Sequence, residues 1–297
     1  MSASIQKEFV ETELLRVAYE RRGEGAPVLL LHGWPDDVRT WDSVATILTD
    51  QGYSTIAPYS RGYGETTFRD ASTERSGQVV ALAQDAIDLL DALGLEKVTV
   101  VGHDWGCRAG YALAALWPER IERLIALSGG YETGIKPGQD IEPEQARAYW
   151  YQWFWNTDRG REALQKNRDE VCRFLWETWA PSFQFSDDEF ETTAASWDNR
   201  DWVEIALHSY RVRWGAAPQD PRYASLEERL LKHPKISVPT TVLHGEEDGA
   251  SLVQSSEEQE SSFTGPYRRE VLRGVGHFVP RENPRAVVDA VLGTPSS

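Results

Sequence analysis

Cysteine is scarce in this chain, with only Cys107 and Cys172 among 297 residues. Two cysteines so far apart do not form the disulfide framework that holds small secreted domains together. The sequence also lacks CxxC and HExxH, spacings at which cysteines or histidines commonly bind zinc. It therefore predicts neither a disulfide scaffold nor a metal centre.

Long apolar runs are missing as well. No segment approaches the roughly eighteen apolar residues of a membrane-spanning helix, and the first twenty residues lack the apolar stretch of a signal peptide. Both absences predict a cytoplasmic protein. Hydrophobic residues still make up 40% of the chain, enough for one large domain or for a core with an insert.

Basic residues are fewer than acidic ones: the chain has 31 basic and 47 acidic residues, which gives a net charge of −16. Nucleic acids and anionic membranes bind to positively charged surfaces, so neither is expected as a partner. An excess of acidic residues is typical of a well-solvated surface, and adaptation to high salt is the alternative explanation.

Short apolar strands alternate with amphipathic helices at both ends of the chain. The predicted strands cover residues 28–31, 54–57, 98–101, 124–127, 240–243 and 269–272. The predicted helices cover residues 40–50, 76–93, 106–116 and 284–292. Such alternation predicts an α/β fold in which helices flank a mostly parallel sheet.

The alternation stops in the middle of the chain, where no strand is predicted. Helices are predicted at 143–156, 160–179, 187–197 and 200–214, and this region holds eight of the twelve tryptophans. The sequence therefore predicts a helical cap of residues 135–235, inserted into an α/β core formed by residues 1–134 and 236–297.

The segment GHDWG (102–106) lies between a predicted strand and a predicted helix. A Gly-x-Ser-x-Gly in this place is a nucleophile elbow, but here Asp104 stands in the position of the serine. An aspartate is already ionised near neutral pH. Attack by Asp104 on a saturated carbon gives an ester that water can cleave, whereas serine would give a stable ether. The segment thus predicts opening of an epoxide or displacement of a halide, unless Asp104 only caps the helix.

Further candidate residues follow the last two predicted strands, at the sheet edge where ligands bind in such folds. His277 follows the final strand and would activate a water molecule against the ester. Asp248 follows the preceding strand and would orient His277. The order nucleophile, acid, histidine is the order found in α/β-hydrolases.

Three other carboxylates compete with Asp248 for the role of the acid. Glu246 and Glu247 precede it directly, and Glu132 follows the predicted strand 124–127. Glu132 is the least expected of these, because it follows a different strand.

An oxyanion hole requires two backbone N–H groups near the developing charge. The amide of Trp105, directly after the nucleophile, is one candidate, and the amide of Trp34 in HGWP (32–35) is the other. Pro35 donates no hydrogen bond, and a cis Trp34-Pro35 bond would hold this turn. A plain tight turn is the alternative for this stretch.

HGWP (32–35), RGYG (61–64), GHDWG and GH (276–277) together resemble the α/β-hydrolase superfamily and, more narrowly, the soluble epoxide hydrolases. The resemblance covers most of the chain, cap included. It implies that two cap tyrosines hold the epoxide oxygen. Tyr151, before a glutamine, and Tyr210, before an arginine, match that pattern. Tyr149 is the nearest rival of Tyr151, and simple packing in an aromatic cap is the alternative for either.

Two dehalogenase families share the aspartate nucleophile. Haloalkane dehalogenases also have a tryptophan directly after the aspartate, so the indole of Trp105 would bind halide. They usually have an asparagine where this chain has Trp34, so one halide ligand is missing here. Fluoroacetate dehalogenases usually have two arginines, one directly after the nucleophile and one three residues later. This chain has Trp105 at the first position and matches only the second, with Arg108.

The resemblance thus implies an epoxide hydrolase that needs no cofactor. The many tryptophans favour a small apolar or aromatic substrate, and core packing of the cap is the alternative explanation for them. A haloalkane or haloacid dehalogenase and a non-catalytic binding protein are the alternatives. The sequence leaves the oligomeric state open between monomer and homodimer.

Overall fold

One mixed sheet runs through the protein in a computed structural model that describes residues 6–132 and 141–294. Its strand order is β1-β2-β4-β3-β6-β7-β8-β9, with β5 paired to β2. Pairing is antiparallel on both sides of β2 and parallel from β4 to β9. The strands are β1 (Gln6–Glu11), β2 (Leu15–Arg22), β3 (Ala26–Leu31), β4 (Tyr53–Pro58), β5 (Thr67–Phe68), β6 (Val98–His103), β7 (Ile121–Leu127), β8 (Thr240–Gly245) and β9 (Tyr267–Leu272).

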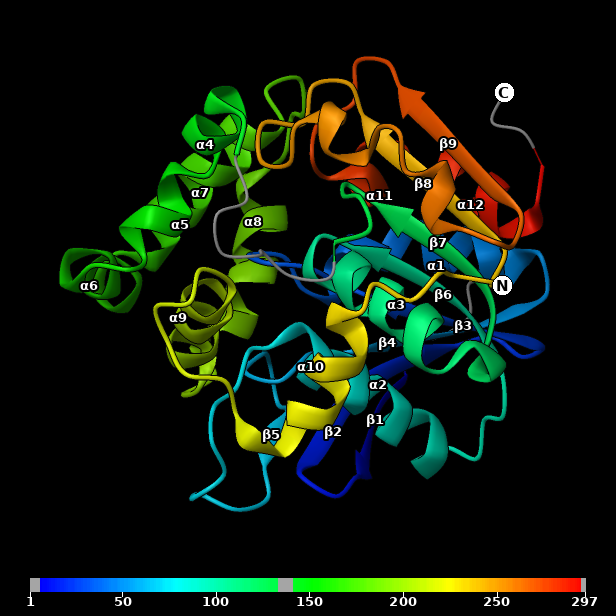
Figure 1. Cartoon of the computed structure of the whole chain (residues 1–297), viewed down its shortest axis with the longest axis horizontal. Coiled ribbons are helices and arrows are strands. Elements are labelled where there is room, and N and C mark those ends of the chain that lie inside the picture. The colour runs from blue at the N-terminus through cyan, green and yellow to red at the C-terminus, as the bar shows by residue number, and fades with distance from the viewer. Residues whose placement is uncertain (1–5, 133–140, 295–297) are drawn as a thin grey trace.

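Helices cover both faces of this sheet (Figure 1). On one face pack α1 (Asp42–Asp50), α11 (Val279–Glu282) and α12 (Pro284–Leu292), and on the other α2 (Val79–Ala92), α3 (Trp105–Leu116) and α10 (Ala224–Leu231). Successive strand side chains alternate between the two faces. In β3, Val28 and Leu30 join one core cluster, and Leu29 and Leu31 join the other.

The prediction of an α/β fold with a mostly parallel sheet is confirmed, and each predicted strand and core helix is present. The predictions missed the hairpin of β1 and β2. In this hairpin charged residues interrupt the apolar ones, and β1 forms the edge of the sheet. These two strands therefore lack the continuous apolar run that marks the doubly covered parallel strands.

Helices fill the chain between β7 and β8, and no strand occurs there among residues 141–235. Figure 1 shows most of them beside the sheet. They are α4 (Pro143–Ala148), α5 (Trp150–Phe154), α6 (Asp158–Lys166), α7 (Arg168–Trp179), α8 (Asp187–Ala194) and α9 (Trp202–Arg213). Two long predicted helices are thus each divided in two, at Tyr149 and at Asn167. α10 packs against α3, and the predicted boundary at 134/135 lies outside the described residues.

Aromatic side chains join this helical part to the sheet. Trp155, Trp179 and Trp202 are at most 2% exposed, and each ring contacts Trp34, which follows β3. Burying aromatic rings contributes much of the packing energy at such a contact. None of the described helices has the length and apolar character needed to cross a membrane.

A buried arginine joins the loop after β4 to α2. Arg61 is 1% exposed and binds both carboxylate oxygens of Asp85 at 2.6 Å, while its remaining Nη1 donates to the Ser76 carbonyl at 2.8 Å. Removing one partner of a buried ion pair leaves the other charge buried and uncompensated. The free energy of unfolding then falls much more than it does when an exposed ion pair is removed.

We therefore expect Arg61→Met to lower the free energy of unfolding by about 3–5 kcal/mol, measured by urea denaturation. Lys7→Met is the matched control. It removes an ion pair to Glu65 whose partners are 43% and 57% exposed, so its expected cost is below about 1 kcal/mol. Equal losses in the two variants would contradict this account.

Candidate active site

Asp104 occupies a sharp turn between β6 and α3. Its φ of 52° is uncommon for a residue other than glycine. The flanking glycines allow this turn, because a Cβ on Gly102 would overlap the Gly106 carbonyl, and a Cβ on Gly106 would overlap the Leu31 carbonyl. Close backbone contact on both sides thus holds Asp104 at the end of the strand.

One oxygen of the Asp104 carboxylate is fixed by a backbone amide. The Trp34 N–H donates to Oδ1 at 2.9 Å, and the Trp34-Pro35 bond is cis, as the sequence predicted. Trp105 is the first residue of α3, so its N–H has no acceptor within the helix. The helix N-terminus also favours negative charge at this point.

His277 lies between the two aspartates. Its Nδ1 is 3.0 and 2.9 Å from the two oxygens of Asp248, and its Nε2 is 3.8 Å from Oδ2 of Asp104. Since an ionised carboxylate only accepts, Nδ1 carries the proton and the opposite nitrogen faces Asp104. Asp248 also accepts the N–H groups of Ala250 and Ser251 at 2.8 and 2.9 Å.

Charge determines the ionisation of this pair. Burial lowers the pKa of His277, but the negative charges of Asp248 and then of Asp104 outweigh burial, so the pKa is raised above its usual value. Burial raises the pKa of Asp248, but the positive charge of His277 and the hydrogen bonds outweigh it, so the pKa is lowered. Asp248 therefore stays ionised beside an unusually basic histidine.

The three competing carboxylates lie elsewhere. Glu132 accepts hydrogen bonds from Arg108 and Arg213 at 2.5 and 2.7 Å, Glu246 is exposed, and Glu247 binds a serine hydroxyl. Of the four candidate acids, the structure brings only Asp248 to His277.

Tyr151 from α5 and Tyr210 from α9 meet above Trp34. Their ring centroids are 5.5 Å apart, and they lie 6.2 and 5.5 Å from that of Trp34. Burial and then the carboxylate of Asp104 raise the pKa of Tyr151, and the same charge contributes to raising the pKa of Tyr210 after burial and Tyr151. Among the described ring contacts, Tyr149 packs on Trp214 at 6.1 Å and, of these two tyrosines, contacts only Tyr151, at 6.5 Å.

Both tyrosine hydroxyls accept a hydrogen bond from a donor whose direction is fixed. The Trp105 indole N–H donates to the Tyr210 hydroxyl at 3.2 Å. The Trp214 indole donates to Oε1 of Gln152 at 2.8 Å, which leaves the amide nitrogen of Gln152 to donate to Tyr151 at 2.9 Å. Each tyrosine therefore keeps its own O–H proton for another acceptor.

Sequence reasoning missed the groups that hold the backbone around His277. The His277 carbonyl accepts from Nε2 of His103 at 2.8 Å and from the Ser128 hydroxyl at 2.7 Å. Burial and then the neighbouring His277 lower the pKa of His103 to about 4, so it is neutral. Glu282 accepts the two amides that flank His277, at 2.7 and 2.9 Å. The position of His103, directly before the nucleophile, could have indicated its role. No sequence pattern marked Ser128 or Glu282.

Neither a metal site nor a reactive thiol accompanies these residues. Within residues 6–132 and 141–294, no group of three or more histidine, cysteine or acidic side chains could hold a metal ion. Cys107 and Cys172 are both buried and unbridged, and burial raises the pKa of each thiol. The convergent groups are thus a carboxylate, a carboxylate-bound histidine, backbone donors and two hydroxyls.

The fold and this arrangement define a class of protein. The α/β hydrolase fold family matches residues 26–284, and the chain belongs to that family.

Several relatives of known structure or name are similar over nearly the whole chain. The crystal structure of a candidate epoxide hydrolase from Klebsiella pneumoniae is 38% identical, with a TM-score of 0.91, covering 97% of this chain and 96% of that one. Epoxide hydrolase A of Mycobacterium tuberculosis is 25% identical over 95% of both chains. The soluble epoxide hydrolase of a Corynebacterium is 26% identical over 93% of this chain and 92% of its own.

The negative charge of Asp104 leads to a prediction about the pKa of His277. In Asp104→Asn a neutral amide replaces a negative charge that favours the imidazolium, so the pKa of His277 should fall. A pH titration of the imidazole resonances by NMR measures this shift. Glu246→Gln, which neutralises an exposed carboxylate near the same strand end, should leave the pKa of His277 in place. An unchanged or higher pKa in Asp104→Asn would refute the coupling.

Proposed function

We propose that this protein hydrolyses epoxides to vicinal diols through a covalent ester on Asp104. The names of relatives similar over nearly the whole chain support this chemistry, and so does the arrangement around Asp104. The aromatic walls favour a small apolar or aromatic substrate.

In the first step Oδ2 of Asp104 attacks a ring carbon and the carbon–oxygen bond of the epoxide breaks. Oδ1 stays bound to the Trp34 amide, which leaves Oδ2 as the attacking atom. The ring oxygen takes a proton from Tyr151 or Tyr210. The product is a hydroxyalkyl ester of Asp104 that contains every atom of the substrate.

In the second step Nε2 of His277 takes a proton from water, and the resulting hydroxide attacks Cγ of Asp104. Negative charge develops on Oδ1, where the amides of Trp34 and Trp105 form the proposed oxyanion hole. Asp248 stabilises the imidazolium. Collapse of the intermediate breaks the bond between Cγ and Oδ2. The leaving alkoxide takes the remaining proton of the attacking hydroxide, so the diol is released and the carboxylate is restored. The imidazolium returns its proton to the tyrosinate.

One observation carries this proposal: each cap tyrosine hydroxyl accepts a hydrogen bond, from Trp105 or from Gln152, and so keeps its own proton to donate to a substrate oxygen. An epoxide oxygen leaves as a poor alkoxide and needs such donors, whereas a halide leaves without protonation. A halide site at Trp105 would use the indole N–H, which here binds Tyr210. The geometry therefore favours an epoxide over the haloalkane or haloacid alternative.

Trapping the intermediate tests the mechanism. We expect His277→Gln to form the ester and to hydrolyse it slowly, because attack by Asp104 needs no base. Intact-protein mass spectrometry with styrene oxide should show a gain equal to the full substrate mass, and peptide mapping should place it on Asp104. The double variant with Asp104→Asn should show no such adduct.

A folded His277→Gln protein that is unlabelled by epoxides would contradict the ester mechanism. A gain of only the alkyl mass, obtained with a haloalkane and not with an epoxide, would establish the dehalogenase instead.

The two hydroxyls can be tested one at a time. Tyr151→Phe and Tyr210→Phe should each lower the single-turnover alkylation rate about a hundredfold, since losing one donor to a developing charge costs about 3 kcal/mol. Tyr149→Phe is the matched control, because its ring packs on Trp214. If both single variants alkylate at the wild-type rate, the assignment of the cap donors is wrong.

A further inference from the structure

Arg281 on α11 carries a buried charge that the proposed mechanism does not use. Its side chain is 4% exposed, and that of its partner Asp36 is 0% exposed. Nε and Nη2 of Arg281 donate to the two oxygens of Asp36 at 3.1 and 2.5 Å. Burial raises the pKa of Asp36, but the positive charge of Arg281 outweighs burial, so the pKa is lowered and both groups are charged. Two parallel hydrogen bonds between charged, planar groups fix their orientation as well as their distance.

The β3 turn (residues 32–36) carries the proposed oxyanion donor and ends at Asp36. Trp34 stands in its middle, and the Trp34 amide binds Oδ1 of Asp104. Pro35, between Trp34 and Asp36, has no N–H to donate. On this side of Trp34 the turn is tied to α11 through the Asp36 side chain.

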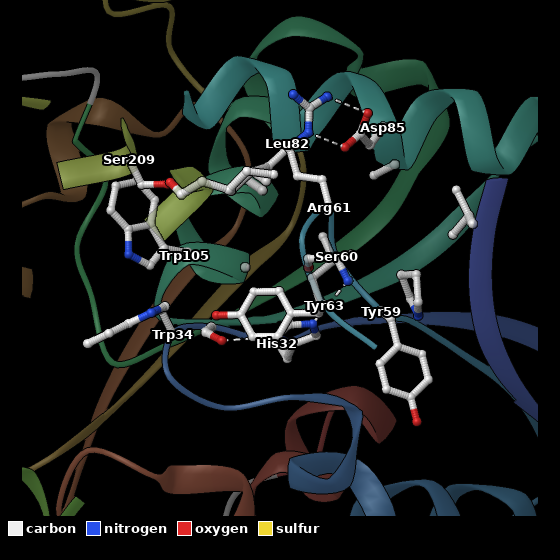
Figure 2. Close-up of a pocket in the computed structure, with 18 of the residues that line it drawn as sticks. His32, Trp34, Tyr59, Ser60, Arg61, Tyr63, Leu82, Asp85, Trp105 and Ser209 are labelled. Atoms are coloured by element: carbon white, nitrogen blue, oxygen red, sulfur yellow. Dashed lines mark hydrogen bonds and ion pairs between the residues drawn. The ribbon is translucent and has the colours of Figure 1, made fainter. Parts of the chain in front are cut away.

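The other end of the β3 turn is held by His32. Because a carbonyl oxygen only accepts, Nδ1 of His32 donates to the Gly33 carbonyl at 2.9 Å. The opposite nitrogen, Nε2, accepts the Ser60 amide at 3.1 Å, and Figure 2 shows this bond beside Trp34. Side chains thus anchor the turn on both sides of the Trp34 amide, and Arg281 supplies the anchor on the side of α11.

The same short helix also holds the backbone of the proposed base. Glu282 directly follows Arg281. Its carboxylate accepts the amides of Gly276 and Phe278, which flank His277, at 2.7 and 2.9 Å. Two consecutive side chains of α11 therefore hold the histidine loop and the β3 turn, and Arg281 connects the second to the first.

The guanidinium of Arg281 reaches the inserted helices as well. Nη1 donates to Glu189 at 2.7 Å and Nη2 donates to the Thr193 hydroxyl at 2.9 Å, both on α8. Its Cζ lies 4.6 Å from the centroid of the Trp176 ring on α7. A lysine carries the same charge but cannot reproduce this planar set of donors, so Arg281→Lys separates the geometry from the charge.

We propose that Arg281 is a positioning residue for hydrolysis of the ester on Asp104. Two groups from different loops act on the same carbon in that step. Nε2 of His277 directs the water molecule at Cγ, and the Trp34 amide must lie where charge develops on Oδ1. Arg281 sets the position of one loop relative to the other, and an error of about 1 Å in such an alignment costs about a hundredfold in rate. The inference rests on the proposed function and adds a residue to its second step.

The first step places a weaker demand on this alignment. Attack on the epoxide takes negative charge away from the Asp104 carboxylate, and His277 takes no proton in it. A displaced Trp34 amide therefore slows hydrolysis of the ester more than it slows alkylation. A general loss of structure would slow both steps instead.

Separate rate constants for the two steps test this inference. In Arg281→Lys, quenched-flow mixing with styrene oxide and intact-protein mass spectrometry should show the ester on Asp104 forming within about twofold of the wild-type rate. Its decay should be at least about tenfold slower than in the wild type. Unchanged decay, or equal slowing of formation and decay, would overturn the proposal.

Arg173→Gln is the matched control. Arg173 on α7 also binds α8, through Asp187 at 2.9 Å, and its Cζ lies 4.2 Å from the centroid of the Phe190 ring. In the part of the chain that the structure describes, no hydrogen bond or ion pair joins Arg173 to the β3 turn. Both rate constants should therefore stay within about twofold of the wild-type values.

A double variant covers the case in which Arg281→Lys does not fold. Replacing both partners of a buried ion pair by apolar residues is often neutral for stability, so Arg281→Met with Asp36→Leu should fold and show the same slow decay. Decay at the wild-type rate in this variant would overturn the proposal. Absence of any ester on Asp104 in His277→Gln would instead contradict the proposed function, so the two failures are distinguishable.

Discussion

The close contact between the elbow and the end of β3 is the constraint on which the candidate site depends. Gly106 packs against the Leu31 carbonyl so tightly that no side chain fits between them. Because β3 and β6 are neighbouring parallel strands, with Leu31 opposite Gly102, the turn after β3 crosses directly beside Asp104. The Trp34 amide reaches the carboxylate for the same reason. A single backbone contact thus positions both the proposed nucleophile and its proposed oxyanion donor.

Sequence alone predicts the parts of this site that local chemistry fixes. GHDWG required a turn that only glycines allow, and the order of strands placed Asp248 and His277 at the same sheet edge. Tertiary contacts decided the rest. The pairing of Glu132 with Arg108 and Arg213 depends on α9 packing beside α3, and the choice of Tyr151 over Tyr149 depends on which ring reaches Trp34. Neither is encoded in spacing along the chain.

The charge of Asp104 changes during the proposed cycle, and the basicity of His277 changes with it. In the free protein the Asp104 carboxylate helps to raise the pKa of His277. Esterification removes that negative charge, so the pKa of His277 falls at the stage where it must be neutral to accept a proton from water. The acid limb of ester hydrolysis should therefore lie below the pKa of His277 in the free protein. Asp248 keeps its charge throughout, so the orientation of the imidazole persists.

The two proposed steps draw on different parts of the fold. Asp104, His277 and Asp248 all follow strands of the sheet, whereas Tyr151 and Tyr210 lie on helices inserted between β7 and β8. Hydrolysis of the ester uses the residues that follow the strands, with the His277 amide bound to the carbonyl of Trp179 at the end of α7. Opening of the ring depends also on where α5 and α9 lie. Two sets of contacts hold α9 beside α3. The Trp105 indole donates a hydrogen bond to Tyr210. One helical turn further on, Arg108 of α3 and Arg213 of α9 both bind the carboxylate of Glu132. Because the first of these joins Tyr210 to the residue directly after Asp104, the position of one proposed proton donor is tied to that of the proposed nucleophile.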